Sequence, residues 1–206
     1  MRVKTIPCWY SFDMNEVVTY LERLREIALD QYGFVTVAQA VDAGVPRVEL
    51  PKMAARGRLE RMAHGVYRVP QVASSPQENL ALAVLWTASD EACLSHDTAL
   101  AAWDVSDINP DRVHVSIPRH RRLRRAGGDR YVLHRQDVPP SEKTWWEQLP
   151  ITTLPRTIED CIESGVPTYL LRQALERGGR TSMLPPPQRE RLVDLLERRD
   201  GRQDTP

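Results

Sequence analysis

The hydrophobic pattern near the start of the chain predicts a long amphipathic helix. Asp13 and Glu16 have the spacing of an N-cap residue and its capping partner. Apolar residues then recur every three or four positions as far as Ile27, which is the spacing of one helical face. Such a face has to be covered, because burying each large apolar side chain is worth about 1.5–3 kcal/mol.

Two shorter helices are predicted next. Thr36 and Gln39 make a second capping pair, and Gly44 occupies the place of a helix-terminating residue. Pro46 fits the first turn of a third helix, where no backbone N–H is needed. Pro51 then falls in the middle of this third helix, where a proline costs roughly 3 kcal/mol unless the helix is short, kinked or restarted there.

The stretch "GRLERMAHGVYRVP", residues 57–70, alternates apolar and polar residues around a turn at Ala63, His64 and Gly65. This pattern predicts a β-hairpin. Two helices joined by a short turn and followed by a hairpin have the order of a winged helix-turn-helix. We therefore expect residues 1–72 to form a winged helix-turn-helix domain.

The rest of the chain, residues 76–206, predicts a mixed α/β domain, so that the whole chain is an α+β protein. Strict alternation in "RVHVSIP" indicates a half-buried strand, and "RYVLH" and "PITTLP" indicate two more. The expected helices are a first one from Pro76 to Trp86, a second from Thr98 to Trp103, and three later ones near 155–164, 167–177 and 187–199.

Composition excludes several classes of protein. Hydrophobic residues make up 41% and charged residues 27% of the 206 positions, which is typical of a folded soluble protein. No apolar run approaches the roughly 18 residues of a membrane span, and no signal peptide precedes the first helix, so a cytoplasmic location is expected. The three cysteines are far apart, and the histidines lack metal-ligand spacing. We expect no metal and no cofactor.

The zero net charge hides a strong partition. Residues 47–68 carry six basic and two acidic groups, and residues 119–135 carry seven arginines and one aspartate. Residues 86–111 carry six acidic groups and no Lys or Arg. Basic groups on a winged domain attract DNA phosphates, although a solvated surface or a protein-binding module remains the alternative. The candidate DNA contacts are Arg47, Lys52, Arg56, Arg58, Arg61, His64 and Arg68.

"RHRRLRR", residues 119–125, is the strongest local charge signal. Its Arg119, Arg121, Arg122, Arg124 and Arg125 are further candidates for phosphate contact. The alternatives are a solvated hairpin tip between two strands, or a contact with an acidic surface of a partner. The acidic stretch 86–111 fits either a basic partner or this loop within the same chain.

Enzymatic activity is not expected. Ser95, His96 and Asp97 are consecutive, and consecutive residues do not converge as a catalytic triad, so Ser95 is interpreted as a helix cap. A nuclease needs clustered carboxylates for Mg²⁺. The candidates for such a cluster are Asp137 and Glu142 with Lys143, which lie in a proline-rich stretch.

Three segments resemble the AbiEi-type antitoxins of bacterial AbiE toxin–antitoxin pairs. They are "FVTVAQAVDAGVPRVELPKMAARGRLERMAHGVYRVP", "CLSHDTALAAWDVSDINPDRVHVSIPRHRRLRR" and "ITTLPRTIEDCIESG". The resemblance implies an N-terminal domain that binds inverted repeats in its own promoter and represses it. It also implies a second domain that counteracts a cognate toxin with a nucleotidyltransferase fold, by direct contact or otherwise. The family pattern has no proline at position 51. A stand-alone winged-helix regulator without a toxin is the alternative.

Overall fold

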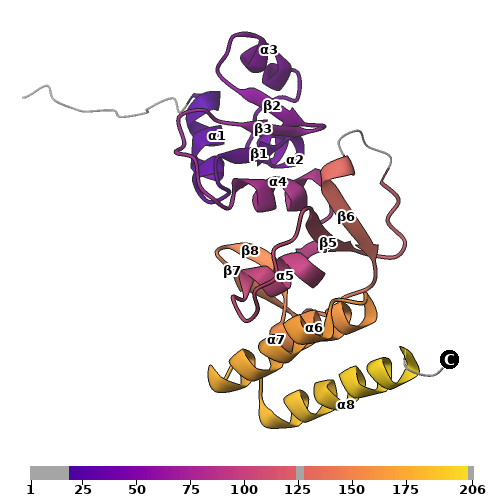
Figure 1. Ribbon diagram of the computed structural model, residues 1–206. Helices are drawn as coiled ribbons and strands as arrows, with labels where there is room; N and C mark the ends of the chain where they lie inside the picture. The colour runs from indigo at the N-terminus through magenta and orange to yellow at the C-terminus, as the bar shows by residue number, and fades with distance from the viewer. Residues whose placement is uncertain (1–18, 124–127, 204–206) are drawn as a thin grey trace, which may run out of the picture.

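The computed structural model describes residues 19–123 and 128–203. At one end lies a small domain of three helices and a three-stranded sheet (Figure 1). Its first helix, α1 (Tyr20–Leu29), begins at a capping box formed by Thr19 and Glu22. The start predicted at Asp13 lies outside the described residues. The helix buries Leu24 and Ala28, as an amphipathic helix should.

The second predicted helix is confirmed in detail. Helix α2 (Val37–Asp42) has a capping box in which Thr36 and Gln39 bond each other's backbone N–H groups. Gly44 follows the helix with φ +77°, the left-handed conformation that favours glycine at this position. Its N–H group donates to the carbonyl of Val41 over 2.9 Å. A local sequence signal therefore sets both ends of this helix.

The predicted hairpin is also confirmed. Strands β2 (Glu60–Ala63) and β3 (Val66–Arg68) pair antiparallel across the turn at His64 and Gly65, and Gly65 has φ +75°. A third strand, β1 (Phe34–Thr36), pairs with the other edge of β3 and gives the sheet order β1-β3-β2. The hairpin is thereby fixed to the helices as a wing.

The second domain contains a five-stranded mixed sheet, which confirms the α+β class. Its strand order is β6-β5-β4-β8-β7. The strands are β4 (Cys93–Leu94), β5 (Val113–Ile117), β6 (Tyr131–Arg135), β7 (Lys143–Trp146) and β8 (Leu149–Thr152). Two short 3₁₀ turns, η1 (Gly128–Arg130) and η2 (Pro140–Glu142), precede β6 and β7. The alternative in which residues 119–125 are a hairpin tip is wrong, because β5 and β6 pair in parallel.

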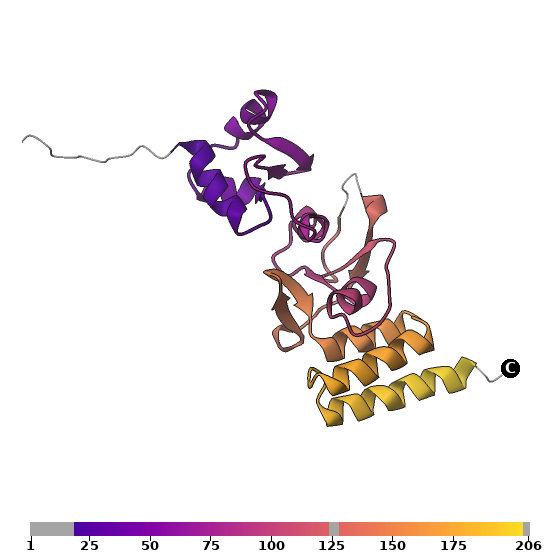
Figure 2. The same cartoon turned by 60° about the vertical axis from the view of Figure 1, so that its left-hand side comes forward.

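Helices cover this sheet and extend the chain away from it. Helix α5 (His96–Ala102) packs against β5 and against α6 (Leu154–Glu163). Figure 2 shows α6, α7 (Thr168–Arg180) and α8 (Pro186–Gln203) stacked in successive layers. A hydrophobic cluster that includes Leu154, Leu171 and Leu192 joins them. No helix in the described part of the chain is both long and apolar enough to cross a membrane.

One helix connects the two domains. Helix α4 (Glu78–Trp86) packs against β1 and β3 of the wing sheet and against β4 and β5 of the large sheet. Phe34 and Val66 from the winged domain belong to the same hydrophobic cluster as Ala81 and Trp86 of this helix. The side chain of Tyr32 also donates a hydrogen bond to the carbonyl of Glu147. The wing is therefore held against the second domain.

Candidate nucleic-acid interface

Helix α3 (Glu49–Ala55) occupies the place of a recognition helix in the winged domain. The helix begins three residues after Pro46, so the prediction that Pro46 lies in its first turn is wrong. Pro51 is instead its third residue. The first N–H groups of any helix have no partner within it, so the missing N–H of proline interrupts nothing there. Pro51 thus fits the first turn of a short helix.

The same helix separates its apolar and basic sides. Leu50 and Met53 are buried in the domain core, whereas Lys52 and Arg56 are exposed. Nζ of Lys52 lies 2.7 Å from Oε1 of Glu49, which precedes it by one helical turn. The basic side chains therefore point away from the core, into solvent.

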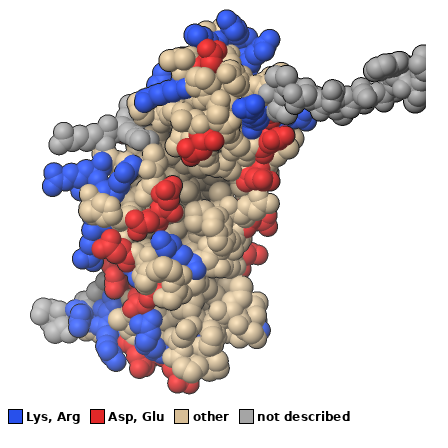
Figure 3. Space-filling view, turned by 180° about the vertical axis from the view of Figure 1, so that it is seen from behind, with Lys and Arg blue, Asp and Glu red and all other residues tan. Residues whose placement is uncertain are grey.

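The wing presents further cations beside this helix. Leu59, Val66 and Tyr67 are buried, whereas Arg58, Arg61 and His64 are exposed. Arg61 on β2 is directly opposite Tyr67 on β3. In Figure 3, basic side chains gather at the α3 end of the molecule, at the top of the view. The exposed members of the predicted set are Arg47, Lys52, Arg56, Arg58, Arg61 and His64.

Arg68 differs from the other predicted contacts. Its side chain is only 11% exposed, and its Nη2 donates to the carbonyl of Val72, the hydroxyl of Ser74 and the carboxylate of Glu78. The last of these contacts joins β3 to the first turn of α4. Arg68 thus connects the wing to the second domain.

The arginine-rich loop after β5 is partly folded onto the protein. Arg119 lies beside Asp137, with both side chains well exposed, and its N–H donates to that carboxylate. Arg121 donates to the carbonyls of Thr87 and Ala88 at the end of α4. Arg122 is exposed, and the predicted Arg124 and Arg125 lie outside the described residues. Between residues 119 and 123, no ion pair is formed with the acidic stretch 86–111.

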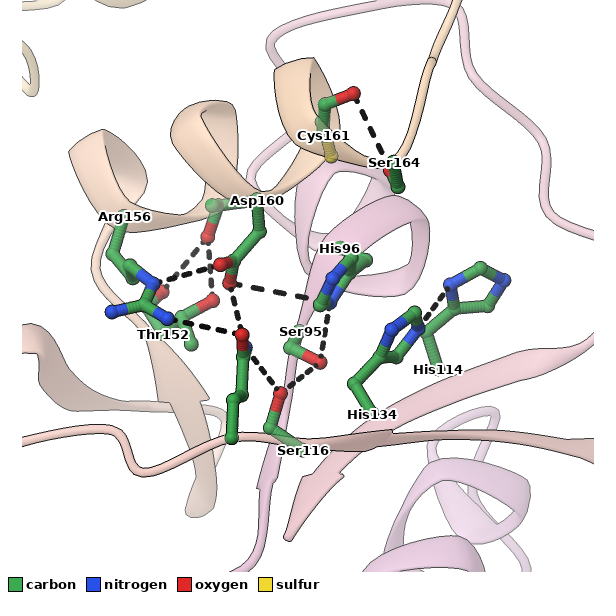
Figure 4. A network of polar contacts seen from close by, with 12 residues as sticks. Ser95, His96, His114, Ser116, His134, Thr152, Arg156, Asp160, Cys161 and Ser164 are labelled. Carbon is green, nitrogen blue, oxygen red and sulfur yellow. Dashed lines mark hydrogen bonds and ion pairs between the residues drawn. The ribbon is translucent and has the colours of Figure 1, made fainter. Parts of the chain in front are cut away.

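Sequence reasoning did not find the polar cluster at the centre of the second domain. Figure 4 shows how residues from α5, β5, β6 and α6 meet there. Ser95 precedes α5 without capping it, because its hydroxyl contacts Nδ1 of His96 at 3.0 Å and the hydroxyl of Ser116 at 2.7 Å. Asp97 lies 3.9 Å from His114 instead. Ser95, His96 and Asp97 therefore form no triad with one another.

Three histidines adjoin in this cluster. The rings of His96 and His134 stack with centroids 3.3 Å apart, and Nε2 of His134 lies 3.1 Å from Nδ1 of His114. Burial lowers the pKa of His96 to about 3, with His134, His114 and Arg156 adding to the effect. Burial lowers the pKa of His134 to about 4, and electrostatic repulsion from His114 adds to this effect. These two rings are neutral at pH 7.

A charged pair adjoins the histidines. Asp160 is 1% exposed, and Arg156 donates to it over 2.8 Å. Gln136 joins Asp160 to Ser116, and Asp160 is 4.0 Å from Nδ1 of His96. Burial raises the pKa of Asp160, while Arg156 opposes that rise. The network ties α6 to the end of β6 and to β5.

The described residues contain no group of three His, Cys, Asp or Glu side chains arranged to hold a metal. The three residues considered for a nuclease site each contact a different partner. Asp137 contacts Arg119, Glu142 pairs with Arg156, and Lys143 donates to the carbonyl of Glu91 over 3.4 Å. The histidine cluster carried no signal in the sequence, because its members are 18 or more residues apart and meet only through the sheet and α5.

Comparisons with known proteins identify the first domain. The sequence model of a family described as "Transcriptional regulator, AbiEi antitoxin" matches residues 22–70, from the first turn of α1 to the end of the wing. The crystal structure of the RV2827C protein from Mycobacterium tuberculosis is similar, with 17% sequence identity over 85% of this chain and 81% of that chain, at a TM-score of 0.43. No curated protein matches the chain. The chain thus carries at its N-terminus the transcriptional-regulator domain of the AbiEi antitoxin family.

Proposed function

We propose that this protein is the antitoxin of a bacterial toxin–antitoxin pair. It represses its own operon by binding inverted repeats in promoter DNA, and it neutralises a cognate toxin with a nucleotidyltransferase fold. The observation that carries the DNA part is the set of exposed basic residues on α3 and the wing. This set lies on the domain that matches the family. Binding to a promoter places the protein in the cytoplasm, and no enzymatic activity is part of the proposal.

The geometry of the domain supports contact between both elements and one duplex. The exposed basic residues are Lys52 on α3, Arg56 directly after this helix, and Arg58 and Arg61 at the base of the wing. They are close together in the chain. Basic side chains at such positions bind phosphates and fix the protein on DNA. Arg122 in the loop after β5 is a further candidate. Arg68 holds β3 of the wing against α4 through its ion pair with Glu78, so its contribution to DNA binding is indirect.

The experiment measures binding of the full chain to the DNA upstream of its own gene. We expect a salt-sensitive complex, which Arg56→Ala and Arg61→Ala weaken. Each phosphate contact removed lowers the slope of log affinity against log salt by about 0.9. Arg180→Ala, which changes another exposed arginine, on α7, serves as the matched control. Absence of a salt-sensitive complex, or equal effects of all three variants, would contradict the DNA part.

The toxin part is tested by co-expression with the neighbouring gene. Helix α4 shares its core with Phe34 and Val66, so the full chain is used rather than a fragment. We expect the full chain to restore growth of cells that express a nucleotidyltransferase-fold toxin. The double variant with Arg56→Ala and Arg61→Ala is expected to bind DNA weakly. If it still restores growth, neutralisation of the toxin does not depend on repression of the operon. A neighbouring gene without such a toxin would favour the stand-alone regulator.

A further inference from the structure

A large cleft lies between the winged domain and the second domain. Its volume is about 1430 Å³, whereas sites for small molecules usually have about 300–1,000 Å³. One wall comes from α2 and the turn of the wing, and the other from α4 and the β7–β8 hairpin. The cleft is therefore large enough to hold a drug-sized ligand between the two domains.

Apolar side chains line much of this cleft. Trp145 on β7 is 72% exposed, and Val41 on α2 is 48% exposed. Val37 and Leu85 line the space beside them. Apolar and aromatic side chains gathered on the walls of one cavity are typical of a ligand site, because the ligand removes their surface from water.

The same walls carry uncompensated negative charge. Asp30, Asp42 and Asp90 line the cleft, against one arginine, Arg47, so three carboxylates and one guanidinium leave a net charge of −2. All four residues are exposed. Among the described residues, none of the three carboxylates has an ion-pair partner. Their charges are therefore free to attract a cation.

Two aromatic side chains add to the preference for positive charge. Trp145 and Tyr32 both line the cleft, one from each domain. The face of an aromatic ring attracts a cation within about 6 Å of its centre, and tryptophan does so most strongly. The cleft therefore favours a ligand that combines an apolar body with a positive charge.

The backbone around the cleft has several uncommon conformations. Tyr32, Ala88 and Gln148 line it with φ values of +55°, +45° and +59°. Glu147, whose carbonyl accepts a hydrogen bond from Tyr32, has φ +46°. Such conformations are costly for residues other than glycine, and they occur preferentially at ligand sites and switch regions. The turns that shape the cleft are thus of the kind found at binding sites.

We propose that this interdomain cleft binds an organic cation with an aromatic or aliphatic body. Asp30, Asp42 and Asp90 attract the positive charge, and the body covers Val41 and Trp145. One unit charge at about 4 Å in water-like surroundings changes an affinity roughly fivefold. The net charge of the walls should therefore favour a cation over an anion of the same shape by about tenfold or more. This proposal does not depend on DNA or on a toxin.

Isothermal titration calorimetry of the full chain tests the proposal with two probes of the same shape. Tetraphenylphosphonium and tetraphenylborate carry the same phenyl rings and opposite charges. We expect tetraphenylphosphonium to bind one site per chain, about tenfold or more tightly than tetraphenylborate. Trp145→Ala should weaken its binding about threefold. Tyr169→Ala, at another exposed aromatic residue, on α7, should leave the affinity unchanged.

A pair of double variants locates the bound charge. Asp30→Asn with Asp90→Asn should remove most of the preference for the cation. Asp111→Asn with Asp194→Asn changes two exposed aspartates outside the cleft and should preserve it. Equal effects of the two double variants would place the cation elsewhere on the surface and overturn the proposal.

Three further outcomes would also overturn the proposal. The first is that tetraphenylphosphonium does not bind at about millimolar concentration. The second is that the unsubstituted protein binds both probes equally. The third is an affinity for tetraphenylphosphonium that falls as the protein concentration rises, which would show that a second copy of the chain occupies the cleft.

Discussion

Arg68 on β3 and Glu78 in the first turn of α4 form an ion pair of 3.1 Å between the wing and the second domain. The arginine is mostly buried and also donates to Val72 and Ser74. The orientation of the wing therefore depends on a residue of the neighbouring domain. The winged domain therefore has a direct structural connection to the second domain.

Removing this connection should destabilise the protein. Hydrogen bonds to charged groups are worth about 1.5–3 kcal/mol, so Arg68→Ala should lower the free energy of unfolding by about that amount in chemical denaturation. Arg61→Ala, an exposed arginine on the same hairpin, should change it by less than about 0.5 kcal/mol. If Arg68→Ala instead left stability unchanged and lowered the salt slope of DNA binding, Arg68 would be a phosphate contact.

The buried pair of Arg156 and Asp160 makes a second prediction. Arg156→Ala leaves a carboxylate uncompensated in the interior and should cost about 3–5 kcal/mol. Replacing both residues by leucine should recover most of that loss, because no buried charge then remains. Arg191→Ala breaks the more exposed pair with Glu159 and should cost less than about 1 kcal/mol. Thermal and denaturant unfolding measure all three variants, and equal losses for Arg156→Ala and Arg191→Ala would contradict the argument.

The histidine cluster should make the fold sensitive to acid. The pKa values of His96 and His134 in the folded protein, about 3 and about 4, are below the value of about 6.5 in an unfolded chain. The unfolded state therefore binds protons first, and stability that is complete above pH ~6.5 is lost as the pH falls toward 4.

At pH 5 each of these histidines should contribute a loss of about 2 kcal/mol relative to pH 7. Denaturant unfolding at the two pH values measures the difference. His134→Gln should reduce the difference by about half, whereas His120→Gln, on the exposed loop, should leave it as it is in the unsubstituted protein. A difference that His134→Gln does not change would show that other groups control the acid transition.

Two adjacent glycines in α7 should respond in opposite directions. A Cβ at Gly178 would lie 3.0 Å from Cδ2 of Leu154 and 3.4 Å from Leu184, and overpacking of this kind costs about 1–3 kcal/mol. A Cβ at Gly179 meets only the flexible side chain of Arg189, and alanine gains about 1 kcal/mol over glycine within a helix. Gly178→Ala should therefore lower the melting temperature and Gly179→Ala should preserve or raise it. Similar shifts for both would contradict the packing of α6 and α7.

The parts of the fold that depend on neighbouring residues were predictable from the sequence. The capping pair of Thr36 and Gln39, the stop at Gly44 and the turn at His64 and Gly65 are local signals, and each is found where it was expected. The two-residue strand β4, in contrast, is defined by β5 and β8, which are both far from it in the chain. The parallel pairing of β5 and β6 was missed for a different reason. The alternation of apolar and polar residues specifies the two faces of a strand and not its direction.

The candidate site divides in the same way. Charge counts along the sequence identified the basic residues of α3 and the wing, and most of them are exposed. The sequence did not distinguish Arg68 or Arg121, whose partners come from α4 and its C-terminal end. The backbone of His96 adopts φ +50°, an uncommon conformation for a residue other than glycine, and no composition or spacing rule predicts such a position.

Under the proposed function, the shortness of α3 limits how much sequence information one chain can obtain from DNA. Seven residues rise about 10 Å along a helix axis, which corresponds to about three base-pair steps of 3.4 Å. A word of three base pairs occurs by chance about once in ~64 positions along a genome. An operator for such a protein must therefore contain the three-base-pair sequence more than once at a fixed spacing. Most of the selectivity must then come from this spacing rather than from the three base pairs themselves.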